Sequence, residues 1–209
     1  MVMSTSYEAG GRTNQKQRTR AALLAAARGL LATGRTPTVE DAASRAAVSR
    51  TTAYRYFPNQ TALLVAAHPE VAATSLLPAD PPADPAERLD LVIVAFTRLI
   101  VDTEAQQRAM LRLSLEADDQ QRAALPLRQG RAIGWIQEAL APLDGQLSDQ
   151  DRHRLVLAIR SAVGIEALAW LTDVARLTHD EAISLMRWSA HALLHAALTS
   201  GPPPTTVAV

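Results

Sequence analysis

The stretch TVEDAASRAAVSRTTAYRYF, residues 38–57, decides the fold of this chain. Its residue spacing predicts two short helices joined by a tight turn. Thr38 can cap the first helix, and Asp41 three residues later completes a capping box. Ser49 offers a cap for the second helix. The sequence therefore predicts a helix-turn-helix, an arrangement with which many proteins reach into DNA.

The second of these helices has two unlike sides. Ala53 and Phe57, four residues apart, mark the side that faces inward. At 3.6 residues per turn, Arg55 points most directly away from that side. Hydroxyl, guanidinium and phenol groups bind base edges and phosphates, although a polar face on a short helix is also the usual form of a solvated surface. The candidate DNA contacts are Thr38, Ser49, Arg50, Thr51, Thr52, Tyr54, Arg55, Tyr56 and Gln60.

Helical patterns on both sides of this stretch favour the DNA-reading interpretation. Residues 17–34 form an amphipathic pattern with basic residues at its start and Gly34 at its end. Downstream, Pro58 and Asn59 open another helix. We interpret residues 1–13 as a flexible arm, which is either a plain solvated terminus or a basic strip for the phosphate backbone. The basic residues of the arm and the following helix start are Arg12, Lys16, Arg18 and Arg20.

This block resembles the N-terminal domain of the TetR/AcrR family of bacterial transcriptional regulators. The hallmark of the family is a helix, a helix-turn-helix, the motif Y-x-x-F-P and a fourth helix, and Tyr54, Phe57 and Pro58 match the motif. The resemblance implies an all-α fold of about nine helices, with a three-helix helix-turn-helix DNA-binding domain before a helical bundle that binds ligand and dimerises. It also implies a transcriptional regulator, by family default a repressor that a small-molecule effector releases from a palindromic operator.

The chain departs from the commonest family pattern at a few positions. Ala42 stands where a larger aliphatic residue is usual, and Thr51 stands where glycine is frequent. Ala47 replaces the usual turn glycine, so a positive φ there would strain the backbone. Gln60 replaces a phosphate-binding lysine. Backbone amides at the start of that helix can still cradle a phosphate, so we expect only a weaker non-specific component of DNA binding.

Charge is distributed unevenly along the chain. The sequence has 21 basic and 21 acidic side chains and a formal net charge of zero. Residues 1–70 nevertheless contain nine Lys or Arg against four Asp or Glu, while residues 71–209 contain twelve against seventeen. The basic part of the chain is thus the part that contains the helix-turn-helix.

The composition excludes several other classes of function. The chain has no cysteine, which excludes disulfides, thiol redox sensing and cysteine-ligated zinc. No secretory signal is visible, and no apolar run approaches the roughly twenty residues that cross a bilayer, so we expect a cytoplasmic protein. We expect no cofactor. An all-helical enzyme is disfavoured, because no cluster has the spacing of a catalytic motif.

A proline-rich segment, LLPADPPADP, divides the chain into two domains. We therefore expect a flexible arm over residues 1–13, a DNA-binding domain over 14–75, a linker over 76–85, an effector-binding and dimerisation domain over 86–200 and a disordered tail over 201–209.

The last two predicted helices, residues 148–173 and 178–199, are the longest and most apolar. Thr178 and Glu181 form a capping box for the second. Apolar residues cover more than one side of each helix, which indicates burial against the core and against a partner, or wholly within the core. The resemblance implies a homodimer through these two helices. Small residues that would permit close approach are Ala162, Gly164, Ala167 and Ala169.

The resemblance further implies an effector pocket among the C-terminal helices, coupled reciprocally to DNA binding. Glu166 lies in an apolar run, where it can bind a cationic ligand or pair with an arginine of the bundle. Aromatic and methionine side chains are also common in ordinary cores. A constitutive DNA-binding protein without an effector remains an alternative, and a cavity would distinguish the two. The candidate lining residues are Phe96, Met110, Trp135, Glu166 and Trp170.

Two residue pairs on the predicted C-terminal helices have i, i+4 spacing. His191 and His195 could hold a metal ion, but no carboxylate or cysteine ligand lies near them in sequence, so we expect a solvated or interface pair and no metal. Arg112 and Glu116 are spaced for an ion pair.

Overall fold

The computed structural model describes residues 5–67, 73–116 and 131–202, with side chains from residue 14 onward. These residues form helices and no β-strand, which confirms the all-α fold. The chain divides into two units, residues 1–71 with 112–126 and residues 72–111 with 127–209.

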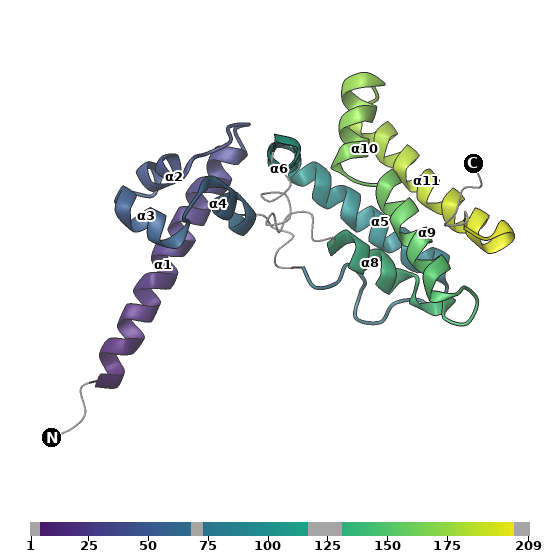
Figure 1. Ribbon diagram of the computed structural model, residues 1–209, viewed down its shortest axis with the longest axis horizontal. Helices are drawn as coiled ribbons and strands as arrows, with labels where there is room; N and C mark the ends of the chain where they lie inside the picture. Colours follow the sequence, from purple (N-terminus) through teal and green to yellow (C-terminus); the bar gives the residue numbers. More distant parts are fainter. Residues whose placement is uncertain (1–4, 68–72, 117–130, 203–209) are drawn as a thin grey trace. The chain divides into compact units, whose positions relative to one another are not determined.

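The N-terminal unit begins with helices α1 (Thr5–Leu31), α2 (Val39–Arg45), α3 (Arg50–Tyr56) and α4 (Gln60–Ala67). The helices α2 and α4 pack against α1, and α3 packs against α2 (Figure 1). Leu23 and Ala27 of α1 and Leu63 and Leu64 of α4 are fully buried between them. This small apolar core fixes the position of α3 through its neighbour α2.

Local caps set the starts of α2 and α3. The Thr38 hydroxyl accepts a hydrogen bond from the Asp41 amide at 3.1 Å, and the Asp41 carboxylate accepts one from the Thr38 amide at 2.9 Å. The Ser49 hydroxyl accepts one from the Thr52 amide at 3.2 Å. Both predicted caps are confirmed, and each satisfies amides that have no partner within the helix.

The turn between α2 and α3 places Ala47 at a φ of +52°. The Val48 amide closes the turn by donating to the Ala43 carbonyl at 2.9 Å. An alanine in this left-handed region costs about 1 kcal/mol, because its Cβ approaches the following carbonyl. The structure therefore has a positive φ at the position where alanine replaces the usual turn glycine.

Helix α1 differs from the sequence interpretation at its start. We expected a flexible arm over residues 1–13, whereas the helix begins at Thr5. Once a helix is nucleated, each added residue gains one backbone hydrogen bond, so a polar segment with glycines can continue an existing helix.

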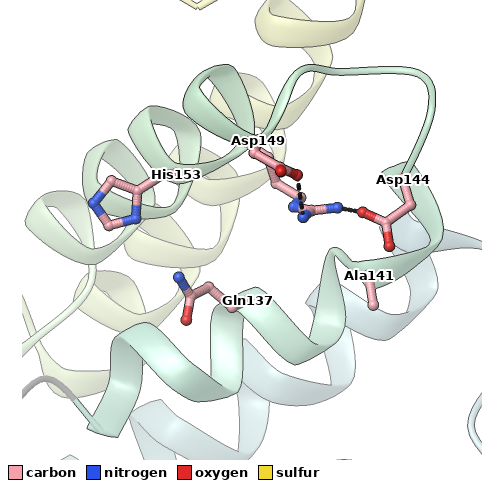
Figure 2. A pocket seen from close by; sticks show the side chains of 6 residues that line it. Gln137, Ala141, Asp144, Asp149 and His153 are labelled. Carbon is pink, nitrogen blue, oxygen red and sulfur yellow. Dashed lines mark hydrogen bonds and ion pairs between the residues drawn. The ribbon is translucent and has the colours of Figure 1, made fainter.

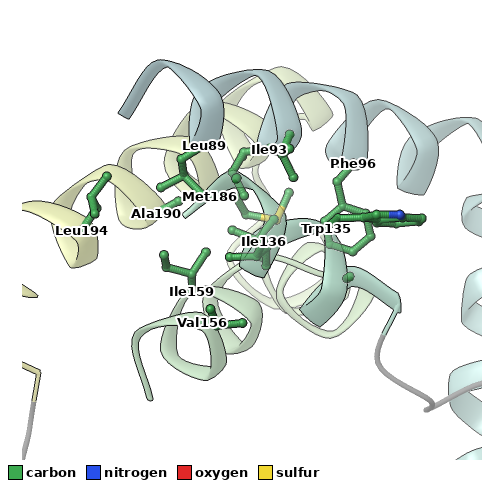
Figure 3. Close-up of a cluster of buried hydrophobic side chains, with 14 of the residues drawn as sticks. Leu89, Ile93, Phe96, Trp135, Ile136, Val156, Ile159, Met186, Ala190 and Leu194 are labelled. Atoms are coloured by element: carbon green, nitrogen blue, oxygen red, sulfur yellow. The ribbon is translucent and has the colours of Figure 1, made fainter. Parts of the chain in front are cut away.

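From residue 72 onward the helical segments are α5 (Pro85–Asp102), α6 (Glu104–Glu116), α8 (Arg131–Ala139), the short 3₁₀ helix η3 (Ala141–Leu143), α9 (Asp149–Ala162), α10 (Ile165–Ala169), the π-helical turn η4 (Trp170–Val174) and α11 (His179–Ser200). Helix α5 packs against α8 and α11, and α9 packs against the same two helices. Figure 3 shows the core between them, in which Leu89, Ile93, Ile136, Val156 and Ile159 are fully buried.

Thr178 and Glu181 form the expected capping box at the start of α11. The predicted continuous helix over 148–173 is wrong, however, because Val163 and Gly164 are extended and separate α9 from α10. The Arg160 guanidinium and the Glu166 carboxylate fill the space beside Gly164, where a Cβ would collide with the guanidinium. The ion pair across the break thus takes the place of a side chain at residue 164.

The same region, Asp149–Val174, is long and apolar enough to cross a membrane by length and composition. The expectation that no run approaches this length was therefore wrong. Part of its apolar surface lies in the bundle core, where Val156, Ile159 and Leu168 are fully buried, whereas Trp170 and Val174 are exposed. Its hydropathy is that of a core segment packed against α8 and α11.

Candidate nucleic-acid interface

Helix α3 has the two sides that its sequence predicts. Ala53 is fully buried and Phe57 is 3% exposed, so both face the core. Thr51 and Arg55 are exposed on the opposite side. Thr52 and Tyr56 are half-buried at the flanks. The inward side is thus confirmed, while contact of the outward side with DNA stays a prediction.

Several predicted DNA contacts are already engaged by the protein. The Thr38 hydroxyl belongs to the capping box of α2 and also donates to the Asp41 carboxylate at 2.8 Å. The Ser49 hydroxyl caps α3 and donates to the Thr52 hydroxyl at 2.8 Å. These side chains hold the two helices in place, and all three residues remain at least partly accessible to a ligand.

The sequence interpretation missed Glu40, which lies in the first turn of α2. The Tyr54 hydroxyl donates to Glu40 Oε1 at 2.6 Å, and the Arg50 guanidinium lies 2.5 Å from the same oxygen. The Arg50 guanidinium also lies 6.0 Å from the centre of the Tyr54 ring. We expected Tyr54 to contact DNA, and in this structure its hydroxyl donates to a carboxylate of the protein. The sequence could have pointed to Glu40, because Glu40 and Asp41 are the only acidic residues among residues 14–67 and Asp41 is already used as a helix cap.

The Glu40 contacts change the acidity of both partners. The hydrogen bond from Tyr54 is the main reason that the pKa of Glu40 lies below its ordinary value, and the Arg50 charge acts in the same direction. The same hydrogen bond raises the pKa of Tyr54 above its ordinary value. Glu40 is therefore a carboxylate and Tyr54 a neutral phenol at neutral pH.

Gln60, at the start of α4, does not point outward as a substitute for a phosphate-binding lysine. Its side-chain amide donates to the Pro37 carbonyl at 3.0 Å, and the residue is half-buried. The side chain is thus engaged in a bond that fixes the entry to α2, and its contact with DNA stays a prediction. Asn59 accepts from the Ala62 amide at 2.8 Å and so helps to start α4.

The described basic residues of α1 lie on its exposed surface. Lys16, Arg18 and Arg20 are exposed, and the Arg20 guanidinium sits 5.6 Å from the centre of the Phe57 ring. This cation–π contact ties the helix to the end of α3. The side chain of Arg12 lies outside the described residues.

The predicted effector residues are only partly brought together. Phe96 and Trp135 are buried and meet edge to face with ring centres 5.8 Å apart (Figure 3). Met110 is also buried. Glu166 pairs with Arg160 at 3.2 Å, so of its two predicted roles the structure shows the ion pair with an arginine of the bundle. Trp170 is 58% exposed and does not face the core, because Leu168 and Leu171 on either side of it do.

One open depression of about 350 Å³ lies elsewhere in the C-terminal unit (Figure 2). Arg152 pairs there with Asp144 and, at 2.9 Å, with Asp149. Arg152 is thus engaged by these two carboxylates, and none of the predicted effector residues lines the hollow. Its lining residues are Gln137, Ala141, Asp144, Asp149, Arg152 and His153.

His191 and His195 of α11 belong to no group of three or more potential metal ligands among the described residues. His191 Nε2 lies 2.9 Å from the Asp90 carboxylate, which Arg187 also contacts at 2.5 and 2.7 Å. His195 is exposed. Arg112 and Glu116 form the expected i, i+4 ion pair, at 3.7 Å.

The comparisons with known proteins agree with this geometry. Residues 21–67, from the second half of α1 to the end of α4, match the family model described as bacterial regulatory proteins, tetR family. The comparison with curated proteins gave no match. The fold is similar to the crystal structure of a TetR transcriptional regulator from Rhodococcus sp. RHA1, with 23% identity, 85% of this chain and 97% of that chain covered, and a TM-score of 0.57. Residues 21–67 of this chain are thus similar to the tetR family of bacterial regulatory proteins, and the fold of most of the chain is similar to that of a solved TetR regulator.

Proposed function

We propose that the protein is a cytoplasmic homodimeric repressor that binds a palindromic operator and leaves it when a small-molecule effector binds in the C-terminal bundle. The observation that carries the proposal is the outward side of α3. Thr51 and Arg55 are exposed there, on a helix whose opposite side is locked into the core by Ala53 and Phe57. A rigid helix with an exposed basic and hydroxyl face fits the major groove.

Backbone groups support the phosphate contacts of such a complex. Helix α4 begins at Gln60, and its first amides lie beside the end of α3 in sequence. Helix N-termini attract phosphate through free amides and the helix dipole. The loss of a lysine charge at residue 60 weakens this contact without removing it.

Dimerisation is supported by exposed apolar side chains on the last helices. Trp188 and Leu185 of α11 are 67% and 41% exposed, and Leu157 of α9 is 42% exposed. Since α9 and α11 pack against each other, these side chains belong to neighbouring helices. Large apolar groups at a surface mark a site for a partner. Two copies would present two α3 helices to successive major grooves of a palindrome.

The small residues predicted for close approach contribute less to this interface than expected. Gly164 is buried, and Ala162 and Ala167 pack against the core of their own unit. This agrees with the alternative in which part of the apolar surface of the last helices is buried within the core of one chain and does not contact a partner. The exposed tryptophan and leucines are therefore the residues on which the dimer proposal rests.

Release by an effector is supported by the apolar bundle and by the aromatic pair within it. The Arg160 guanidinium lies 5.9 Å from the centre of the Phe96 ring, beside Trp135. Aromatic side chains line apolar ligand sites, and the Arg160 guanidinium beside them pairs with Glu166, whose carboxylate an aromatic acid would replace. Constitutive DNA binding without an effector is the alternative, and thermal-shift screening of aromatic acids against the operator complex separates the two.

The test is a selection of purified protein from a library of random duplexes at moderate salt, with the mass of the complex measured. The proposal predicts enrichment of a palindrome and two chains on each duplex. Salt-sensitive binding without enrichment would indicate a non-specific DNA-binding protein. An enriched site that binds a single chain would contradict the dimer.

A further inference from the structure

Glu40 is an acidic side chain on the surface that is expected to face DNA. Its side chain is 34% exposed, and it lies in the first turn of α2, the helix that packs against α3. A carboxylate at such a place repels the phosphate backbone and lowers non-specific affinity. Asp41 beside it has a structural role in the capping box of α2, in which Glu40 takes no part.

Glu40 instead holds two side chains of α3 through a single oxygen. Arg50 and Tyr54 are one helical turn apart, and each contacts Glu40 Oε1, at 2.5 and 2.6 Å. The Arg50 guanidinium also lies above the Tyr54 ring at 6.0 Å. The three side chains therefore form a closed triangle, although Arg50 remains 73% exposed. A long flexible arginine at an exposed site is thereby held in one orientation.

We propose that Glu40 is a positioning residue that makes Arg50 a reader of one guanine in the major groove instead of a general phosphate contact. Arg50 is the first residue of α3, and the first residues of a recognition helix reach base edges. Glu40 engages its Nη2, and a guanidinium has five N–H donors, so donors remain for guanine O6 and N7.

The charge of the pair supports the same role. Arg50 and Glu40 together carry no net charge, so their approach to DNA releases few counterions and adds little sequence-independent affinity. An arginine whose orientation is fixed also loses less freedom when it binds a base. Glu40 thus lowers non-specific binding and favours one base pair. The inference rests on the proposed base-reading role of α3.

The experiment measures binding of the full-length protein to the selected duplex and to duplexes altered at each base pair of a half-site, over a range of salt concentrations. The variants are Glu40→Gln, Arg50→Ala, both together, and Glu40→Asp. Glu87→Gln, on the first turn of α5, is the control for loss of one negative charge. Thermal unfolding of each variant confirms that it is folded.

Glu40→Gln is expected to reduce the preference for guanine at one base pair by about tenfold. It should also steepen the slope of log affinity against log salt concentration by about one. Arg50→Ala should lose preference at the same base pair, and adding Glu40→Gln to it should cause no further loss. Glu40→Asp keeps the charge but shortens the side chain, so it should relax the preference without changing the salt dependence.

Two results would overturn the inference. One is a Glu40→Gln variant with unchanged base preference. The other is a loss of preference that is equal with and without Arg50, which would mean that Glu40 acts directly. Wild-type protein that prefers no base pair would overturn the base-reading function itself, and that outcome is distinct because it appears before any substitution is made.

Discussion

The exposed sides of α3 and α11 differ in chemistry. On α3 the exposed groups are Thr51, Arg55 and the Arg50–Tyr54 pair. Water can form hydrogen bonds with these polar groups until DNA displaces the water. On α11 the exposed groups include Trp188 and Leu185, which water solvates poorly. The comparison indicates that the exposed side of α3 suits a charged partner that binds reversibly, whereas the exposed side of α11 suits a permanent partner.

The largest expected effect comes from placing a charge on the apolar side of α11. Trp188→Glu should convert the dimer into monomers, because a carboxylate would be buried at the interface without a partner. Loss of the second half-site should weaken operator binding by about 100-fold or more. Sedimentation and operator titration measure the two effects. Leu91→Glu, at a 41% exposed leucine of α5, is the matched control and should leave the dimer intact. A dimeric Trp188→Glu variant would place the interface elsewhere.

The next effect concerns the polar side of α3. Arg55→Ala should weaken operator binding by about 1–3 kcal/mol and leave the oligomeric state unchanged, because Arg55 faces away from the core. Arg98→Ala on α5 removes an arginine whose side chain is 83% exposed and is the matched control. Equal losses in the two variants would show that arginine at residue 55 contributes only general charge.

Ala47→Gly tests the strain in the turn that orients α3. Removing the Cβ from a residue with φ of +52° should stabilise the protein by about 1 kcal/mol in a denaturant titration. Ala46→Gly is the opposite control, since Ala46 has a φ of −86° and glycine there should be neutral or destabilising. Stabilisation by both substitutions would refute the strain argument.

The smallest effect is the pH dependence of the ionic contacts between α5 and α11. Hydrogen bonds from Arg187, and then from His191, hold the pKa of Asp90 below its ordinary value of 3.8. A carboxyl whose pKa is lower in the folded state stabilises the fold above its unfolded pKa and loses that contribution as pH falls through the folded pKa. Asp90→Asn should therefore flatten the acid side of the stability profile, whereas Asp80→Asn should not. Equal profiles for the two variants would contradict this.

The predictable parts of the molecule were those set by neighbours in sequence. The caps at Thr38 and Ser49 and the inward side of α3 at Ala53 depend on residues three or four apart, and the structure confirms them. The family motif in turn fixed the order of the first helices.

The parts that could not be predicted depend on contacts between distant residues. Glu40 meets Tyr54 across 14 residues, and Gln60 reaches Pro37 across 23. Helix geometry assigned Tyr54 to DNA and the family resemblance assigned Gln60 to it, and neither kind of inference shows a partner this distant in sequence. The break at Gly164 likewise depends on the Arg160 guanidinium, which fills the space beside it. Trp170, which follows this break, is 58% exposed and does not line the predicted pocket.

The most direct test is the ratio of affinities for the selected operator and for a scrambled duplex of equal length, measured at one salt concentration. We predict a ratio of about a thousand or more for the wild type, and a ratio near one when Thr51 and Arg55 are both replaced by alanine. A ratio that survives both substitutions would contradict the claim that the exposed side of α3 reads DNA.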